Sequence, residues 1–177
     1  MILKDPYDRP LLNLRISVNH ECNLNCFFCH AEGYRVEDKE LMTPEDISQL
    51  VEILAEFGIR SVKLTGGEPL LRDDLEEIVA GIKRVRRVED IGLTTNGVLL
   101  EDRIESLVEA GLDRVNVNIP SLDRAMYRRI TGADVLEKVL RGVEKSLSSG
   151  VKRLKINRVM LKGLNDMELD PLIEFAA

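Results

Sequence analysis

The chain has 177 residues, 44% of them hydrophobic and 32% charged, which suits one domain with an apolar core. Its formal net charge of −6 argues against nucleic-acid and membrane partners, and no run of about 20 apolar residues predicts a transmembrane helix. The first residues lack an apolar signal region, so we expect a cytoplasmic protein.

Strands and helices are predicted to alternate from one end of the chain to the other. The predicted strands occupy residues 11–18, 60–65, 90–96, 113–119 and 151–159. The predicted helices occupy residues 43–58, 71–87, 100–110, 121–130, 134–149 and 167–177. Such alternation indicates right-handed crossovers and a parallel sheet. The sequence therefore predicts an α/β fold, either an open sheet or part of a barrel.

Each predicted strand alternates apolar and polar residues, whereas buried parallel strands are usually continuous apolar runs. The polar positions include Arg15, Lys63, Thr94, Asn118 and Lys155. If helices cover the apolar face, the polar rows line a cavity that suits an anionic ligand, because three of these residues are cationic. The alternative is a sheet with one face in water, where the charged residues only increase solubility.

All three cysteines of the chain, Cys22, Cys26 and Cys29, lie within eight residues directly after the first predicted strand. Three thiols are an odd number for disulfides and one too few for a closed tetrahedral zinc site. In a reducing compartment, such a group is typical of metal binding or catalysis. Its position also fits, because βα folds place their chemistry at the carboxyl ends of the strands.

The segment TGGEP, residues 65–69, follows the second predicted strand at the same end of the sheet. Gly66 and Gly67 allow backbone groups to approach a ligand closely, and Glu68 offers an acceptor to a cationic group. The alternative is an ordinary strand-to-helix turn. The segment TTNG at 94–97 is a weaker signal, because Asn-Gly is common in turns.

The spacing Cys-x3-Cys-x2-Cys, together with GGEP, resembles the radical S-adenosylmethionine (SAM) superfamily. The resemblance implies that Cys22, Cys26 and Cys29 hold a [4Fe–4S] cluster whose fourth iron binds SAM. It further implies that reduction cleaves SAM to a 5′-deoxyadenosyl radical, so that no side chain is the catalytic group. The alternative is a non-catalytic module with structural zinc, in which His20 or His30 is the fourth ligand.

Longer segments are similar to the GTP 3′,8-cyclase family of molybdenum-cofactor (molybdopterin) biosynthesis. These segments are LRISVNHECNLNCFFCH, VKLTGGEPLLRDDL, DIGLTTNGVLL, AGLDRVNVNIPSLD, YRRITGAD and LKINRVMLKGLND. The resemblance implies a partial TIM-type (β/α) barrel of about five βα units. It also implies a lyase reaction that removes the ribose 3′ hydrogen of GTP. The 3′ carbon then attacks guanine C8, which gives (8S)-3′,8-cyclo-7,8-dihydroguanosine 5′-triphosphate.

The same resemblance implies the binding residues. SAM contacts are implied for Phe28, Gly66, Gly67, Glu68 and Asn118. GTP contacts are implied for Arg15, Lys63, Thr94 and Lys155. The chain departs from the family pattern at Lys63, which is commonly Arg, at Asn118, which is commonly Ser, and at Pro120, which is often Asp.

The resembling family continues past the length of this chain, into a sixth strand and a second three-cysteine cluster that holds the guanine. We therefore expect residues 1–177 to be a truncated radical SAM core domain. The expected partners are GTP and a reductant protein for the cluster, and a homodimer is a further option. The remaining alternative within the superfamily is an enzyme that acts on another substrate.

Overall fold

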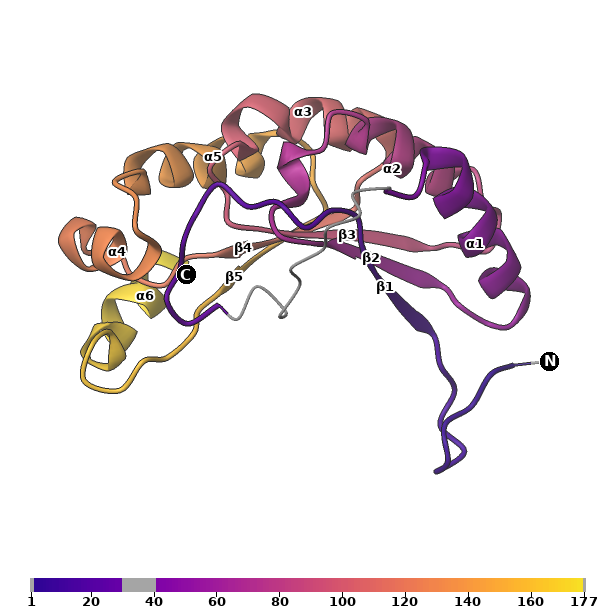
Figure 1. Ribbon diagram of the computed structural model, residues 1–177, viewed down its shortest axis with the longest axis horizontal. Helices are drawn as coiled ribbons and strands as arrows, with labels where there is room; N and C mark the ends of the chain where they lie inside the picture. Colours follow the sequence, from indigo (N-terminus) through magenta and orange to yellow (C-terminus); the bar gives the residue numbers. More distant parts are fainter. Residues whose placement is uncertain (1, 30–40, 177) are drawn as a thin grey trace.

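Five parallel strands form one sheet in the computed structural model of the chain, which describes residues 2–29 and 41–176 (Figure 1). The strands are β1 (Asn13–Ser17), β2 (Ser61–Thr65), β3 (Asp90–Thr95), β4 (Arg114–Asn118) and β5 (Arg153–Asn157). Their order in the sheet is their order in the sequence, β1-β2-β3-β4-β5. The predicted parallel α/β sheet is therefore confirmed.

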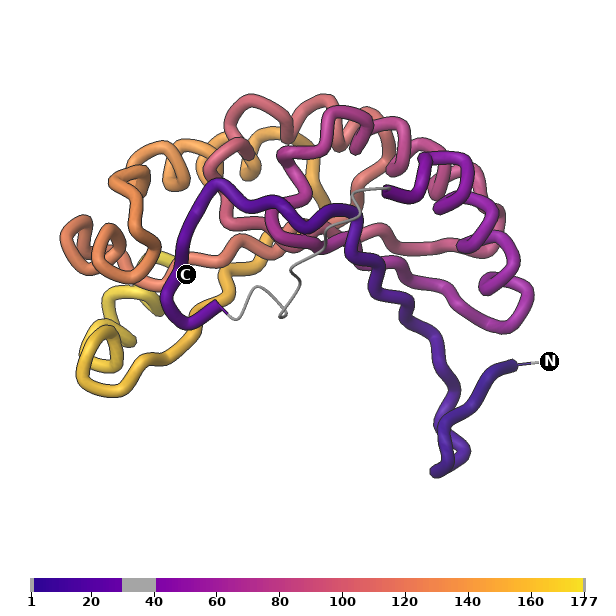
Figure 2. Tube along the Cα trace, viewed as in Figure 1, coloured from indigo at the N-terminus to yellow at the C-terminus, as the bar shows by residue number. Residues whose placement is uncertain are grey.

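The helices are α1 (Pro44–Glu56), α2 (Leu75–Lys83), α3 (Leu100–Ala110), α4 (Arg124–Thr131), α5 (Leu136–Ser148) and α6 (Leu169–Ala176). Two short 3-10 helices are η2 (Pro69–Leu71) and η3 (Asp166–Glu168). The chain trace shows that α1, α2, α3 and α5 all cross the same face of the sheet (Figure 2). Helices on one face and strands in sequential order are the geometry of a barrel wall, whereas a doubly wound sheet has helices on both faces.

The apolar residues of the strands face the covering helices and form the core. Among the fully buried strand residues are Val62, Leu64, Ile91, Leu93, Val115 and Val117. Burial of each such side chain stabilises the fold by about 1.5–3 kcal/mol. The polar residues between them lie on the opposite face, which the four helices leave open (Figure 1). The alternation in the sequence thus correctly predicts the two faces.

The start of α1 follows the capping signals in the sequence. The Thr43 hydroxyl accepts a hydrogen bond from the Asp46 N–H at 3.1 Å, and the Asp46 carboxylate accepts one from the Thr43 N–H at 3.0 Å. Pro44 occupies the first turn, where its missing N–H is harmless. Within the described residues, no helix is long and apolar enough to cross a membrane.

The predicted helix at 71–87 is shorter in the structure, where α2 ends at Lys83. It begins only at Leu75, because Arg72 has an extended backbone (φ −82°, ψ 119°) between η2 and α2. The Arg72 guanidinium donates to the carbonyls of Val18, at 2.8 Å, and Met42, at 2.6 Å. It also pairs with Asp74, the residue before α2. Arg72 therefore interrupts the helix and joins the chain just after β1 to the chain just before α1.

Candidate functional site

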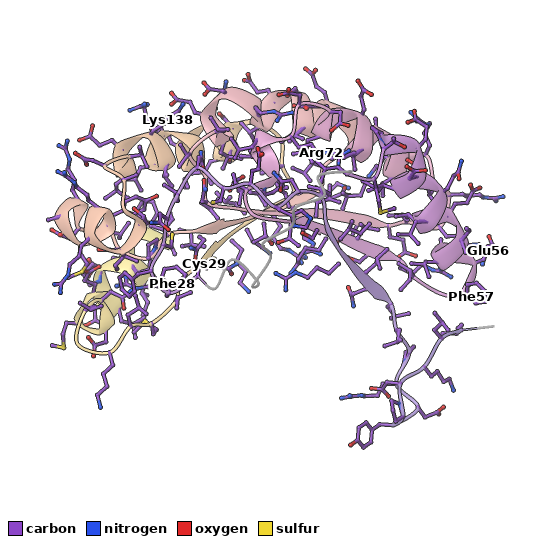
Figure 3. The ribbon with its side chains drawn as sticks, viewed as in Figure 1. Phe28, Cys29, Glu56, Phe57, Arg72 and Lys138 are labelled. Carbon is purple, nitrogen blue, oxygen red and sulfur yellow. The ribbon has the colours of Figure 1, made fainter. Side chains whose placement is uncertain are left out.

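The cysteine loop, residues 19–29, begins after β1 at the carboxyl edge of the sheet. Figure 3 shows Phe28 and Cys29 at this edge, on the side that carries α4 and α6. The Cys29 N–H donates to the Cys26 carbonyl at 2.9 Å and closes a turn between the two residues. Cys22 and Cys29 are exposed and Cys26 is half-buried, so the thiols are open to a group from outside the chain.

The second half of the cysteine loop is hydrogen-bonded to the end of α4. The Asn25 N–H donates to the Thr131 carbonyl at 3.0 Å, and the Phe27 N–H donates to the Ile130 carbonyl at 3.2 Å. Both carbonyls belong to the last turn of α4, and carbonyls in the last turn of a helix have no N–H donor within the helix. The cysteine loop therefore satisfies the end of α4 while α4 holds the loop in place.

The pKa of two of the three thiols, Cys26 and Cys22, is raised. Burial, first, and then the negative charges of Cys22 and Cys29 raise the pKa of Cys26 to about 11. The pKa of Cys22 is also raised, by burial and by the charges of Glu68 and Cys29. Because the thiolate is the form that binds metal, three adjacent thiolates need a strongly positive group among them. The donor set fits a cluster of iron ions, which would supply that charge.

The zinc alternative concerns a single metal ion at the same residues. Among residues 2–29 and 41–176, no three His, Cys, Asp or Glu side chains converge closely enough to hold one ion. A cubic cluster does not need this convergence, because each thiolate binds a different iron. Of the two histidines proposed as a fourth zinc ligand, His20 lies within the described residues and His30 lies outside them.

The GGEP loop, Gly66–Pro69, packs against the start of the cysteine loop. The Gly67 N–H donates to the Asn19 carbonyl at 3.1 Å. A Cβ atom on Gly66 would lie 2.2 Å from Asn19 Oδ1, and one on Gly67 would lie 2.2 Å from the Glu21 carbonyl oxygen. Both distances are far below van der Waals contact. The sequence predicted that these glycines admit a ligand, but the close neighbour that the structure shows is the chain's own cysteine loop.

Glu68 is fully buried, and its carboxylate binds the chain itself. It accepts hydrogen bonds from the Leu70 N–H at 3.0 Å, the Thr95 hydroxyl at 2.6 Å and the Asn96 N–H at 2.7 Å. Burial raises the pKa of Glu68, and the three hydrogen bonds offset part of that rise. The expectation that Glu68 offers an acceptor to a cationic ligand stays a prediction. Its side chain joins the GGEP loop to the end of β3.

Asn96 is a site residue that the sequence analysis missed, since the TTNG segment was interpreted as a turn. Its side-chain amide donates to Asn23 Oδ1 at 2.7 Å and lies 3.7 Å from the sulfur of Cys22. Its N–H donates to Glu68, as described above. The useful signal was the position of Asn96 after β3, at the same carboxyl edge as the cysteines.

The predicted cations lie together on the open face of the sheet. Parallel pairing places Arg15 beside Lys63, Lys63 beside Gly92, and Gly92 beside Arg114. Arg153 extends this row on β5, next to Arg114. Thr94 and Lys155 lie one step nearer the carboxyl edge, each paired with Asn116 of β4. Asn118 ends β4, beside Asn157 of β5.

A cleft of about 620 Å³ lies over the first of these rows. It is lined by Asn13, Leu14, Arg15, Ser61, Lys63, Asp90, Arg114 and Arg153. Of the residues expected to contact GTP, only Arg15 and Lys63 line the cleft. Arg114 and Arg153 line it as well, although the sequence analysis did not single them out.

The cations of the open face differ in how they are neutralised. The Arg114 guanidinium donates to Asp90 at 2.7 Å, whereas Arg15, Lys63 and Lys155 have no ion pair within the described part of the chain. Burial, first, and then the charges of Arg114, Arg15 and Lys155 lower the pKa of Lys63. Uncompensated positive charge therefore gathers here, as an anion-binding surface requires.

The comparisons with known proteins agree with this geometry. The sequence profile of the radical SAM superfamily matches residues 16–176. A probable GTP 3′,8-cyclase of Thermococcus kodakarensis is 50% identical over 176 residues, which are 99% of this chain and 56% of the relative. One of Methanococcus aeolicus is 47% identical over 171 residues, which are 93% of this chain and 57% of the relative. The chain thus spans about half the length of these curated relatives.

Solved structures show the same fold. Streptococcus suis SuiB bound to S-adenosylmethionine aligns with a TM-score of 0.77 at 22% identity, over 93% of this chain and 37% of SuiB. BtrN in complex with AdoMet and 2-DOIA aligns with a TM-score of 0.59 at 25% identity, over 82% of this chain and 57% of BtrN. Enzymes of the matched superfamily use a [4Fe–4S] cluster with SAM. Because the profile covers nearly all of the sequence and the fold agrees, the chain belongs to the radical SAM superfamily.

Proposed function

We propose that this chain is the radical SAM domain of a GTP 3′,8-cyclase. The observation that carries the proposal is the pairing of two features on one sheet. One is a group of three thiols, two of them exposed, and the other is an open face on which Arg15, Lys63 and Lys155 have no ion pair within the described residues. The first feature suits an iron–sulfur cluster, and the second suits a polyanionic substrate such as a nucleoside triphosphate. Relatives at 47% and 50% identity bear the name of this cyclase.

In this proposal, Cys22, Cys26 and Cys29 hold a [4Fe–4S] cluster through one iron each. The group of three protein thiolates leaves the fourth iron to SAM. When bound, the reduced cluster and SAM supply the one-electron chemistry that removes a hydrogen atom from the substrate. The residues of the chain orient these groups and limit the access of water.

The chain's residues near the cluster have two kinds of role. Phe28, half-buried with its ring centroid 6.2 Å from that of Phe27, offers an apolar surface to the adenine of SAM. The backbone of Gly66 and Gly67 offers polar groups to its methionine end. Asn118 offers a side-chain amide at the end of β4. Glu68 acts indirectly, because it holds the GGEP loop against β3.

The phosphates of GTP are proposed to bind the open face through Arg15, Lys63 and Lys155, with Thr94 as a neutral hydrogen-bond donor. Lys63 is suited to this role because burial, first, and its neighbouring cations disfavour its charged form, and a bound phosphate would offset that penalty. We also propose an external reductant protein as the source of electrons. A homodimer and a cytoplasmic location stay predictions.

The test is GTP binding to the anaerobically purified chain, measured by isothermal titration calorimetry. Lys63→Ala should weaken binding by about 10- to 100-fold, the value of one charge-assisted hydrogen bond of 1.5–3 kcal/mol. Lys162→Ala, at an exposed lysine outside the cleft, is the matched control and should leave affinity unchanged. Equal affinity in wild type and Lys63→Ala would contradict the proposed substrate site.

A further inference from the structure

Arg114, the first residue of β4, is held at the amino end of the open face. Its Nε donates to the Asp90 carboxylate at 2.7 Å, and its Nη2 donates to the Ser61 hydroxyl at 3.2 Å. The Ser61 hydroxyl donates in turn to the same Asp90 oxygen at 2.6 Å. The guanidinium therefore has a fixed position, because the first residues of β2 and β3 hold it along one edge.

Gly92 leaves the space that the Arg114 side chain occupies. In the register of the sheet, Gly92 lies between Lys63 on β2 and Arg114 on β4. A Cβ atom on Gly92 would lie 2.7 Å from the central carbon of the guanidinium and 2.9 Å from its Nε, both well below van der Waals contact. The Arg114 side chain therefore crosses the backbone of β3 and reaches β2.

The guanidinium of Arg114 has donors left over. Arginine carries five N–H groups, and only the two that bind Asp90 and Ser61 have partners within residues 2–29 and 41–176. Both N–H groups of Nη1 and one of Nη2 are unused, and a pair of this kind binds phosphate in a bidentate manner. The side chain lines the cleft and is 17% exposed, so a ligand in the cleft can reach it.

The charge around Arg114 favours an anion. The described residues that line the cleft include four cations, Arg15, Lys63, Arg114 and Arg153, and one carboxylate, that of Asp90. After burial, the charge of Arg114 is the next cause that lowers the pKa of Lys63. Neighbouring cations repel one another, and a bound anion would offset that repulsion.

Arg114 lies at the opposite end of the open face from the cysteine loop. Arg114 begins β4 and Asn118 ends it, so the two ends of the strand are about 13 Å apart at about 3.3 Å per residue. In the proposed function, the ribose of the substrate lies near the cluster at the carboxyl edge. Its phosphates then extend towards the amino edge, and the phosphate farthest from the ribose lies nearest to Arg114.

We propose that Arg114 binds the terminal phosphate of a nucleoside triphosphate through its unused N–H groups, and so makes the chain prefer triphosphates to shorter nucleotides. This inference rests on the proposed function, since it takes GTP as the ligand. Arg114 is then a specificity-determining residue, whereas Asp90, Ser61 and Gly92 are positioning residues. Because they fix the guanidinium before the ligand arrives, little side-chain entropy is lost on binding.

The experiment compares the affinities of GTP, GDP and GMP for the anaerobically purified chain, by isothermal titration calorimetry at one ionic strength. Arg114→Gln should weaken GTP binding by about 10- to 100-fold and leave GMP binding unchanged. Gly92→Ala keeps every charge of the cleft but displaces the guanidinium, so it should also weaken GTP and spare GMP. The matched control is Arg141→Gln, since Arg141 pairs with Glu101 and lies outside the cleft, and it should change neither affinity.

Inorganic triphosphate separates the possible failures, because it tests Arg114 without a nucleoside. Arg114→Gln should weaken its binding as well. If it does so while GTP fails to bind the wild type, the proposed substrate is overturned and an anion-binding role of Arg114 is supported. GTP affinity that stays unchanged in Arg114→Gln or Gly92→Ala, with both variants shown to be folded by thermal unfolding, would overturn the inference. An equal loss for GTP and GMP would also overturn it, since Arg114 would then act only through the general charge of the cleft.

Discussion

The two ends of the sheet treat their buried polar groups differently. At the amino end, Asp113 accepts hydrogen bonds from the ammonium groups of Lys152, at 2.6 Å, and Lys83, at 3.2 Å, and from the Ile91 N–H at 2.9 Å. At the carboxyl end, the Glu68 carboxylate is buried with neutral donors only. The charge of Asp113 is thus neutralised by two ammonium groups, whereas the buried carboxylate of Glu68 has no cationic partner among the described residues.

Buried polar atoms without a hydrogen-bond partner also mark the carboxyl end. Asn19 Oδ1 and the Tyr127 hydroxyl are buried without partners among the described residues, and both lie in or beside the cysteine loop. In βα barrels, the amino face generally serves stability and the carboxyl face serves chemistry. The comparison therefore predicts that substitution of Asp113 at the amino end changes stability and leaves cluster binding unaltered, whereas substitutions at the carboxyl end change both.

The largest loss of stability is expected for Glu68→Ala. Removal of the carboxylate leaves the donors of Leu70, Thr95 and Asn96 buried without an acceptor, which costs about 3–5 kcal/mol in total. Iron binding should also be lost, because the GGEP loop no longer holds the cysteine loop. Urea unfolding and iron analysis measure the two effects. Glu52→Ala, at an exposed position of α1, is the control and should change neither.

Asp113→Ala should destabilise the chain by about 2–3 kcal/mol, because it leaves the buried Ile91 N–H without an acceptor and breaks two ion pairs. Iron content should equal that of wild type, since Asp113 is at the amino end. Reduced iron binding in a variant that is still folded at the assay temperature would contradict the claim that Asp113 affects stability and not cluster binding.

The pKa of Asp113 makes the stability of the chain depend on pH. Burial raises its pKa, but the hydrogen bonds from Lys152, Ile91 and Lys83 outweigh burial, so the net pKa is lowered. A carboxylate with a lowered folded-state pKa contributes its full stability above the unfolded value of about 3.9. That contribution is lost as the pH falls through the folded-state pKa. Acid unfolding of Asp113→Asn should therefore show a flatter dependence on pH than that of wild type, and equal slopes would contradict this assignment.

Gly67→Ala is expected to destabilise the chain by about 1–3 kcal/mol, because the added Cβ would overlap the backbone carbonyl of Glu21. The strain falls on the contact between the GGEP and cysteine loops, so iron binding should weaken in parallel. Gly163→Ala is a useful comparison, since a Cβ there meets no atom within 4 Å and any cost comes from its positive φ of +75°. Weakened iron binding in Gly163→Ala, or unchanged binding in Gly67→Ala, would contradict the packing argument.

The smallest stability change is expected for Asn96→Ala, under about 1 kcal/mol, because the side chain is only half-buried. Its effect on the cluster should be larger. Loss of the amide beside Cys22 should reduce iron affinity by about 10- to 100-fold, as for other outer-shell partners of metal ligands. Competition with an iron chelator measures this. An iron affinity equal to that of wild type would show that Asn96 has no role in the site.

The sequence was sufficient for features that depend on local periodicity. Alternation along β2 correctly separated Lys63 on the open face from Leu64 in the core. Capping chemistry correctly placed the start of α1 after Thr43. The position of the cysteines and GGEP after consecutive strands placed both at one edge, because parallel strands end together.

The sequence was insufficient where the partner of a residue is distant along the chain. The acceptor role of Glu68 depends on Thr95 and Asn96, which are 27 and 28 residues away. The need for glycine at position 67 depends on the Glu21 carbonyl. The break before α2 depends on carbonyls that bind Arg72 from two other segments. Periodicity carries no information on such contacts.

The most direct test of the central claim is the Mössbauer spectrum of the anaerobically reconstituted chain, recorded with and without SAM and combined with iron, sulfide and zinc analysis. About four irons and four sulfides per chain are expected, the content of one cubic cluster. SAM should alter the signal of one iron in four, and loss of any one of the three cysteines should abolish the cluster. One zinc ion per chain without iron, or four irons that SAM leaves unchanged, would contradict the central claim.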